Sequence, residues 1–319
     1  MEALNGSAMK IAVLGAGAMG SVYGARLARA GADVTLLDVN ATHVAAVSRD
    51  GLRVAFDEGE DVVQIRAMSP DDFTGPADLI LLFTKVFHTD AALAAIADRI
   101  GNAWVLSLQN GVGNEERIAA YVSPDRILVG MTMTPAEFIG PGHVASHGAA
   151  TTDFYTATGH VDPILDRLAN LLQAGRVTAR INPDIHAAIW EKAAFNCALN
   201  PICALTNGTP GGVGTSEDGR ALADAVVAEA IAVAKSCGVM ASRAHVDDLL
   251  AHAYAYHLMH EPSMLQDIKA QRRTEIDALN GAVVALGEQN GIPVPTNRMI
   301  AQFIRLAESN ARFRATHAT

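Results

Sequence analysis

Three polar side chains recur in the second half of the chain at a spacing that places them on one helix face. Lys192, Asn196 and Asn200 follow i, i+4, i+8 within the otherwise apolar stretch 189–201. Such a stripe is costly to bury unless it finds partners. A lysine among apolar neighbours and amides can have a lowered pKa and act as a general acid. The alternative is a surface ion pair between Lys192 and Glu191, which the two amides make less attractive.

Two further polar residues lie later in the chain. Ser263 with Gln266 fits the S-x-x-Q capping box of a helix start. A helix N-terminus with a free hydroxyl also receives a carboxylate well. Glu275 follows more than three helical turns later, so it need not share the face of Ser263. The alternative for Glu275 is a solvated face shared with Arg272 and Asp277.

Four histidines gather in the same half of the chain. No set of His, Asp and Glu around them has convincing ligand spacing, so we expect no metal site. The histidines are His245, His252, His257 and His260.

A glycine-rich turn follows the first apolar run of the chain. The run Lys10–Leu14 leads into Gly15-Ala16-Gly17-Ala18-Met19-Gly20, and a second apolar run stops at Asp38. Strand, G-x-G-x-x-G turn, helix, second strand and terminal acid together form a dinucleotide-binding unit. Ala18 and Met19 belong to this turn, and the N-terminus of the helix that follows offers free N–H groups to the phosphates. The alternative, a tight turn without a ligand, is disfavoured by the acid.

Each part of this unit has a mechanical role. Gly15 permits the turn, Gly17 lets the backbone approach a pyrophosphate, and Gly20, with Gly24 one turn on, lets the helix pack close to the sheet. Asp38 should hydrogen-bond the adenosine ribose hydroxyls, and its charge would repel a 2′-phosphate. The sequence therefore favours NAD(H) over NADP(H).

The elements that must position these residues follow two different patterns along the chain. Strand-like runs alternate with helix-like runs in the first half, which predicts an α/β, Rossmann-type doubly wound parallel sheet. The strand-like runs are 10–14, 33–37, 79–84, 104–108 and 127–131; the helix-like runs are 19–29, 42–49, 90–100 and 114–121. Runs 52–56 and 62–68 predict an added hairpin, and 134–157 reads as more extended structure.

From residue 185 onward the pattern predicts an all-helical C-terminal domain. We therefore expect a dinucleotide-binding Rossmann domain at 1–183, with 1–8 as a loose leader, and a helical substrate and catalytic domain at 184–319. Binding sites of open α/β sheets lie beyond the carboxyl ends of the strands. Lys85 and Asn110 follow two such ends, where they could face cofactor or substrate. A plain turn is the alternative for Asn110-Gly111.

Composition limits the class of partner. The 319 residues are 50% hydrophobic and 18% charged, with a formal net charge of −10, which argues against nucleic acid. No uncharged apolar run reaches about 18 residues, so we expect no membrane span, and we see no secretory signal. Three sparse cysteines suggest a reducing cytoplasm. A homodimer through the apolar part of 221–258 is one expectation; an ordinary helical core is the other.

The chain resembles the ketopantoate reductase family (2-dehydropantoate 2-reductase) nearly end to end. The resemblance rests on four stretches: the glycine turn 15–20, Gln109-Asn110-Gly111-Val112-Gly113, Lys192 through Pro201, and 263–267 with Thr274-Glu275-Ile276-Asp277. It implies a Rossmann domain joined to a helical domain, and reduction of a 2-keto acid to an (R)-2-hydroxy acid in the pantothenate pathway.

The resemblance also implies residue roles. Lys192 would be the general acid, and Glu275 would position substrate and cofactor ribose. Asn196 and Asn200 would orient the substrate, Ser263 would receive its carboxylate, and Lys85 and Asn110 would form the cofactor-side pair. Hydride must come from a nicotinamide cofactor, because no side chain supplies it.

Two departures from the family keep alternatives open. Many members prefer NADPH and carry a basic or small residue where this chain has Asp38, so NADP(H) remains the family-typical alternative. A segment that often carries another substrate-contacting Asn reads Thr209-Pro210-Gly211 here. The alternatives are an NAD-linked dehydrogenase of another 2-hydroxy acid and, in a different class, a non-catalytic dinucleotide-binding sensor.

Overall fold

The computed structural model describes residues 8–317, so nearly all of the predicted leader lies outside the described residues. The chain forms two compact units. The first runs to Gln109 and resumes over Asn114–Ile185, and the second combines Asn110–Gly113 with the chain from His186 onward. The short segment Asn110–Gly113 therefore belongs to the later half of the chain, although the sequence places it in the first.

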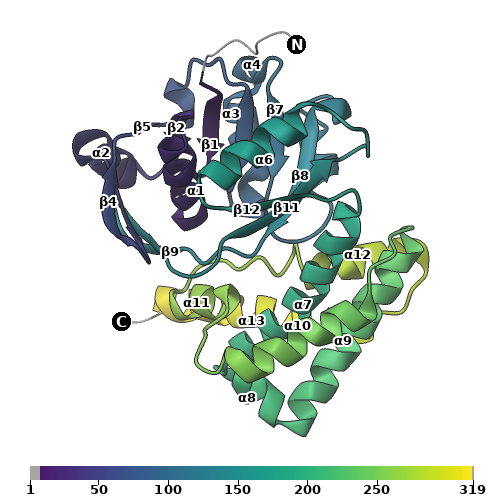
Figure 1. The fold of residues 1–319 in the computed structure, drawn as a ribbon. Coiled ribbons are helices and arrows are strands. Elements are labelled where there is room, and N and C mark those ends of the chain that lie inside the picture. The colour runs from purple at the N-terminus through teal and green to yellow at the C-terminus, as the bar shows by residue number, and fades with distance from the viewer. Residues whose placement is uncertain (1–7, 318–319) are drawn as a thin grey trace. The chain divides into compact units, whose positions relative to one another are not determined.

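The first unit is built on an eight-stranded sheet with strand order β12-β11-β8-β7-β6-β1-β2-β5 (Figure 1). Its strands are β1 (Lys10–Leu14), β2 (Asp33–Leu37), β5 (Arg66–Met68), β6 (Leu79–Leu82), β7 (Trp104–Ser107), β8 (Ile127–Thr132), β11 (Thr151–Thr156) and β12 (Thr178–Ile181). The six neighbouring strands β5, β2, β1, β6, β7 and β8 are parallel, and β11 runs antiparallel to β8. The central strands β1, β6 and β7 are mostly apolar because both faces of the sheet are covered.

Helices cover both faces of this sheet. They are α1 (Ala18–Arg29), α2 (Ala41–Asp50), α3 (Thr89–Ala95), α4 (Ala97–Ile100), α5 (Asn114–Ile118) and α6 (Ile164–Ala174), with short 3-10 turns at Pro70–Asp72, Val86–His88 and Pro124–Arg126. The chain moves from β1 to β2 in one direction and from β6 to β8 in the other. Because such crossovers are right-handed, the helices of the two halves lie on opposite faces. The strand order reverses between β1 and β6, which is where ligands of this architecture bind.

A second sheet of four strands, ordered β4-β3-β10-β9, completes the first unit. Its strands are β3 (Leu52–Phe56), β4 (Gly59–Val63), β9 (Glu137–Gly140) and β10 (His143–Ser146). The predicted hairpin is correct for β3 and β4, which pair antiparallel. It is wrong for Arg66–Met68, which pairs parallel with β2 in the main sheet, where the Arg66 guanidinium meets the Asp33 carboxylate at 2.5 Å.

The second unit is helical, as the sequence predicts. It contains α7 (Ile185–Thr206), α8 (Pro210–Thr215), α9 (Glu217–Ser236), α10 (Arg243–Tyr256), α11 (Ser263–Lys269), α12 (Asn280–Asn290) and α13 (Pro295–His317). One apolar core joins α7, α9, α12 and α13, with Cys197, Val226 and Ile304 fully buried in it. Helix α7 is apolar on nearly all sides, as expected for a helix at the centre of a unit. Within residues 8–317, no helix has the length and apolarity to cross a membrane.

Candidate active site

The first candidate site is the glycine turn between β1 and α1. Gly15 has a φ of +93° and donates its N–H to the carbonyl of Leu37 at 2.9 Å. A Cβ at Gly15 would lie 2.5 Å from the backbone nitrogen of Thr84, just beyond β6. Only glycine combines this backbone conformation with so close an approach. The turn is therefore held at the reversal point between β1 and β6.

The other glycines of the turn differ in what surrounds them. A Cβ at Gly20 would overlap the carbonyl oxygen of Gly15, and one at Gly24 would lie 2.5 Å from the side chain of Leu36 on β2. By contrast, nothing lies within 4 Å of a Cβ at Gly17, which is exposed. The turn is thus packed tightly against the sheet and open at Gly17.

Helix α1 begins directly at this opening. Ala18 and Met19 are its first residues, no side chain caps its N-terminus, and its first turn has no acidic residue. Unpaired N–H groups and the positive end of the helix dipole favour an anion there. The geometry fits the pyrophosphate of a dinucleotide.

A buried histidine supports the turn from below. Gly142 donates its N–H to Nδ1 of His43 at 3.0 Å, so Nε2 carries the ring proton and faces Ser21 Oγ at 3.2 Å. Ser21 in turn donates to the carbonyl of Ala16 at 2.7 Å. Burial lowers the pKa of His43, while the charge of Asp38 opposes that shift. His43 therefore acts as a neutral link, a role that its isolated position in the sequence did not reveal.

Asp38 lies at the carboxyl end of β2, partly exposed. Its Oδ1 accepts the N–H of Asn40 at 2.8 Å, and Asn40 caps α2 through the N–H of His43. This hydrogen bond fixes the orientation of the Asp38 carboxylate at the strand end. The position is the one from which an acid reaches a ribose.

The ends of β6 and β7 are joined by the side chain of Gln109, a residue of the strand end predicted after 104–108, to which no role was assigned. The Nε2 of Gln109 donates to the carbonyl of Thr84 at 2.7 Å and to Thr89 Oγ1 at 2.9 Å. Lys85, the next residue after Thr84, is partly buried and precedes the turn Val86–His88. Gln109 therefore steadies the segment that carries Lys85.

In the second unit, three polar side chains from distant parts of the sequence form one hydrogen-bonded chain. Lys192 Nζ donates to Asn110 Oδ1 at 3.1 Å, and Asn110 Nδ2 donates to Glu275 Oε2 at 3.4 Å. Burial lowers the pKa of Lys192 to about 8, and the negative charge of Glu275 opposes this shift. The pKa of Lys192 therefore lies closer to neutrality than that of an exposed lysine.

The surface alternatives for these residues are wrong. Lys192 is partly buried, while the neighbouring Glu191 accepts the N–H of Ser242 at 2.7 Å and so links α7 to α10. Glu275 is only 8% exposed and does not lie on a solvated face. Helix α11 ends at Lys269, so Glu275 stands in the irregular segment before α12.

The Asn110-Gly111 pair is more than a plain turn. Gly111 has a φ of +87°, and a Cβ there would overlap the carbonyl oxygen of Ala278. The Asn110 segment thus lies directly against the segment that carries Glu275. That segment is itself anchored to α13, because the N–H and the hydroxyl of Thr274 both donate to Glu308 Oε1, at 2.8 and 2.7 Å.

Asn196 and Asn200 share α7 with Lys192, as the spacing predicts. They are 9% and 7% exposed. Neither side-chain amide has a hydrogen-bond partner among residues 8–317. Nearly buried amides without protein partners are available to a polar ligand.

Ser263 is the first residue of α11 and is exposed. The predicted capping box is wrong, because Pro262 occupies the position before the helix and no side chain caps it. Gln266 Nε2 instead donates to the carbonyl of Glu261 at 2.8 Å. The hydroxyl of Ser263 is therefore not used in a cap.

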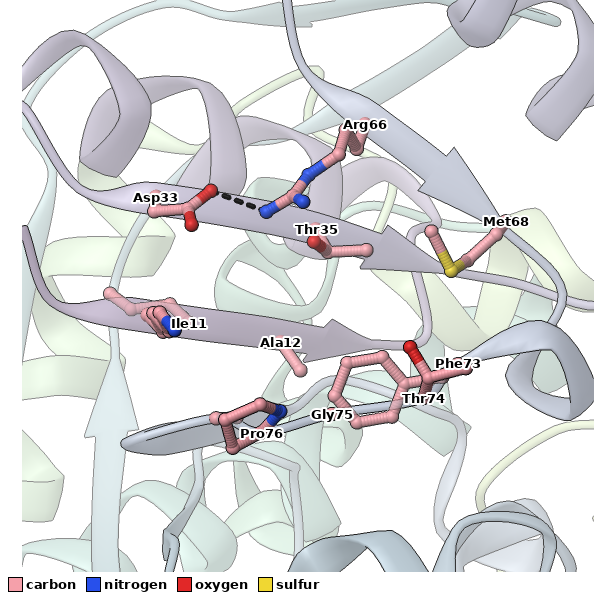
Figure 2. Close-up of a pocket in the computed structure, with 12 residues that line it drawn as sticks. Ile11, Ala12, Asp33, Thr35, Arg66, Met68, Phe73, Thr74, Gly75 and Pro76 are labelled. Atoms are coloured by element: carbon pink, nitrogen blue, oxygen red, sulfur yellow. Dashed lines mark hydrogen bonds and ion pairs between the residues drawn. The ribbon is translucent and has the colours of Figure 1, made fainter.

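A pocket of about 110 Å³ opens elsewhere on the first unit (Figure 2). It is lined by residues of β1, β2 and β5 and by the loop 73–77, and two of the lining residues, Asp33 and Arg66, form an ion pair. None of the predicted site residues lines it. Among residues 8–317, no three His, Cys, Asp or Glu side chains are grouped to hold a metal ion. His252, His257 and His260 contact one another through their rings.

Both halves of the chain match one family. Residues 11–159 match the family described as ketopantoate reductase PanE/ApbA, and residues 184–308 match its C-terminal part. A 2-dehydropantoate 2-reductase of Streptococcus pyogenes is 33% identical over 303 residues, covering 94% of this chain and 98% of that protein. The Halobacterium salinarum enzyme of the same name is 32% identical over 301 residues, with 94% and 99% covered.

Solved structures agree in fold. A ketopantoate reductase of Ralstonia eutropha aligns with a TM-score of 0.89 at 32% identity, covering 95% of this chain and all (100%) of that one. A D-mandelate dehydrogenase, solved with NADH and anilino(oxo)acetate, aligns with a TM-score of 0.90 at 30% identity, with 95% and 100% covered.

Proposed function

The chain belongs to the ketopantoate reductase family of oxidoreductases, and we propose that it reduces 2-dehydropantoate to (R)-pantoate with hydride from a nicotinamide cofactor. The observation that carries this proposal is the hydrogen-bonded chain Lys192–Asn110–Glu275. It places a lysine of lowered pKa on the same helix as two amides available to a ligand.

Lys192 is the general acid of this mechanism. Hydride addition to the carbonyl carbon of a 2-keto acid leaves negative charge on its oxygen. The Lys192 ammonium stabilises that charge and gives the oxygen a proton, which yields the 2-hydroxy acid and a neutral amine. Asn110 orients the ammonium, and Glu275 keeps it protonated at neutral pH by raising its pKa against the effect of burial.

Asn196, Asn200 and Ser263 form the substrate side of the proposal. The two amides on α7 can donate to the keto acid and fix the face of its carbonyl. Ser263, with its hydroxyl unused in capping, receives the substrate carboxylate. Glu275 also contacts the substrate and the cofactor ribose.

The cofactor side consists of the glycine turn, Asp38, Lys85 and Asn110. A nicotinamide cofactor supplies the hydride when it is bound. The turn at 15–20 takes the pyrophosphate, because Gly17 is open and the N-terminus of α1 is uncapped. Asp38 favours NAD(H), since its charge disfavours a 2′-phosphate; NADP(H) is the family-typical alternative.

The test is the initial rate of cofactor oxidation with 2-dehydropantoate, run in parallel with NADH and NADPH. The proposal expects fast oxidation with NADH. Fast oxidation with NADPH alone would keep the reductase and overturn the role given to Asp38. No turnover with either cofactor, on this or any other 2-keto acid, would overturn the enzyme.

A second candidate is an NAD-linked dehydrogenase of another branched or aromatic 2-hydroxy acid. It is favoured by the structural likeness to the D-mandelate dehydrogenase and by the segment at Thr209. There Thr209 Oγ1 donates to the carbonyl of Leu258 at 2.7 Å and accepts the N–H of Gly212 at 3.2 Å, so the protein itself satisfies this hydroxyl. This candidate loses if 2-dehydropantoate has by far the highest kcat/KM among branched and aromatic 2-keto acids.

A further inference from the structure

Helix α7 contains a proline at a position where it leaves a buried carbonyl without its helical donor. Pro201 lies inside α7 and has no N–H, so the carbonyl of Cys197, four residues earlier, loses its normal partner. Cys197 is fully buried, so water does not replace that donor easily. A buried carbonyl of this kind requires a donor from elsewhere in the fold.

Asn280, the first residue of α12, supplies that donor. Its Nδ2 donates to the carbonyl of Cys197 at 3.0 Å and to Asn297 Oδ1 at 3.0 Å, and the residue is 0% exposed. Its Oδ1 has no partner within the described range 8–317. Both N–H groups of this amide are therefore used, although its oxygen is buried without a partner. A residue that only filled space would need neither hydrogen bond.

The far end of this contact is also fixed. Asn297 Nδ2 donates to the carbonyl of Val226 at 3.1 Å and to Glu229 Oε2 at 2.8 Å, and its backbone N–H reaches the same carboxylate oxygen at 2.9 Å. Asn280 is therefore held by α9 and α13 while it grips α7. The cross-link is therefore hydrogen-bonded at both ends.

Both ends of the cross-link lie close to proposed active-site residues. On α7, Cys197 directly follows Asn196, and Asn200 directly precedes Pro201. On the other side, Asn280 closes the tight segment that starts at Glu275, whose carbonyl accepts the N–H groups of residues 278 and 279 at 3.0 and 3.1 Å. One amide thus joins the backbone that carries the α7 stripe to the backbone that carries Glu275.

We infer that Asn280 is a positioning residue, which sets the register between α7 and the Glu275 segment and thereby the geometry of the Lys192–Asn110–Glu275 chain. The inference rests on the proposed function, because that chain is the proposed catalytic machinery. Pro201 is also required, since its missing N–H leaves the Cys197 carbonyl free to accept the hydrogen bond from Asn280. The sequence indicates this contact, because a proline inside a buried helix leaves the carbonyl four residues earlier without its helical donor.

The experiment distinguishes two roles of Asn280: donating to the Cys197 carbonyl, and setting the register between α7 and the Glu275 segment. Asn280→Ala leaves the Cys197 carbonyl unpaired and removes the cross-link. In the double variant Asn280→Ala with Pro201→Ala, the new N–H at 201 satisfies the carbonyl within α7, but the cross-link stays absent. Pro201→Ala alone is the background, and Asn290→Ala, in the last turn of α12, is the matched control with an exposed asparagine.

The result expected is a recovery of Tm without a recovery of catalysis. The double variant should regain part of the Tm lost in Asn280→Ala, the rest staying lost because Asn297 Oδ1 still lacks its donor. Its kcat should nevertheless stay roughly 10-fold to 100-fold below that of Pro201→Ala, as for a small misplacement of reacting groups. Its alkaline pH limb should also move to lower pH, because a more distant Glu275 raises the pKa of Lys192 less. Recovery of both Tm and kcat, or an unmoved pH limb, would overturn the inference even if Asn280→Ala alone does not fold.

A readout without turnover keeps this result distinct from the failure of the proposed function. The chain has five lysines, so reductive methylation with a carbon-13 label gives few NMR signals, and Lys192→Arg assigns the one from Lys192. The pKa of Lys192 should fall in the double variant relative to Pro201→Ala. If wild type reduces no keto acid but this shift appears, the proposed function fails and the positioning role stands; an unchanged pKa overturns the role.

Discussion

The glycine turn at 15–20 and the polar chain at Lys192 form sites in opposite ways. The turn depends on absent side chains: Gly15 and Gly20 leave no room for a Cβ, and Gly17 leaves open space. The polar chain depends on present side chains, which come from residues 110, 192 and 275 and meet through two hydrogen bonds. Added atoms should therefore damage the first site, and removed atoms should damage the second.

Removing the Lys192 side chain should have the largest effect. Without its ammonium no proton reaches the substrate oxygen, so Lys192→Ala should lower kcat by about 10²–10⁴-fold. Lys192→Arg should also be slow, because a guanidinium keeps its proton. Steady-state rates with a fluorescence titration of NADH would check this. A large loss of NADH affinity would break the comparison, and a wild type without turnover would favour the non-catalytic sensor.

Adding a methyl group to the turn should divide its glycines into two kinds. Gly15→Ala should lower the free energy of unfolding by about 1–3 kcal/mol, because both the positive φ and the contact with Thr84 resist it. Gly17→Ala should leave stability near wild type and weaken cofactor binding, because its methyl projects into open space. Thermal melts with NADH titrations would check both. Equal loss of stability in the two variants would contradict the division.

Neutralising Glu275 should shift the pH profile more than it unfolds the protein. The reductase needs protonated Lys192, so the rate should fall as pH rises through about 8. The charge of Glu275 raises the pKa of Lys192, so Glu275→Gln should move this limb to lower pH. The check is kcat against pH for both proteins, with 2-dehydropantoate as substrate. An unmoved limb would show that the carboxylate does not act on the lysine.

Asp38 is a position beside the turn where the charge of a side chain is expected to matter. Asp38→Ala should shift the ratio of kcat/KM for NADH over NADPH toward NADPH by roughly 10-fold, or about 1.4 kcal/mol. The reason is that it removes a charge that repels the 2′-phosphate. Asp71→Ala, an exposed acid in the turn Pro70–Asp72, is a matched control. An unchanged ratio of kcat/KM for NADH over NADPH would show that the charge of Asp38 does not select the cofactor.

The smallest effect concerns the support beneath the turn. The pKa of His43 is lowered in the folded protein, so the unfolded chain takes up this proton first as the pH falls. The stability gained from neutral His43 should be present above pH 6.5, its ordinary value, and be lost progressively below it. His43→Gln should flatten this part of the profile of unfolding free energy against pH. A profile of unfolding free energy against pH identical to that of wild type would show that His43 does not contribute to this pH dependence.

Local patterns predicted the turn because its own residues lie in one short stretch, although Leu37 and Thr84, which hold it against the sheet, do not. The first strand, the glycines and the start of α1 were all readable from spacing. The stripe at Lys192 was readable for the same reason, since one helix carries it. The partners Asn110 and Glu275 meet Lys192 only through tertiary packing, so no local pattern could place them together; the family resemblance named them without their contacts.

The errors have equally physical causes. Ser263 has the residue type of a cap, but Pro262 shifts the helix start by one residue, so the hydroxyl is not used there. The strand Arg66–Met68 alternates like a hairpin arm, yet hydrogen bonds to β2 at the open edge of the main sheet win. Thr274, Asn280 and Glu308 received no role because the contacts Thr274–Glu308 and Asn280–Cys197 join residues 34 and 83 positions apart in the sequence.

The placement of Asn110–Gly113 has a consequence for protein engineering. These four residues belong to the helical unit but are encoded in the middle of the sheet unit, so the chain passes from one unit to the other three times. A fragment starting at His186 would lack the amide that touches Lys192 and the glycine that fits against Ala278. Chimeras that exchange the C-terminal half between relatives must therefore graft this short loop as well, because the modules are not contiguous in the gene.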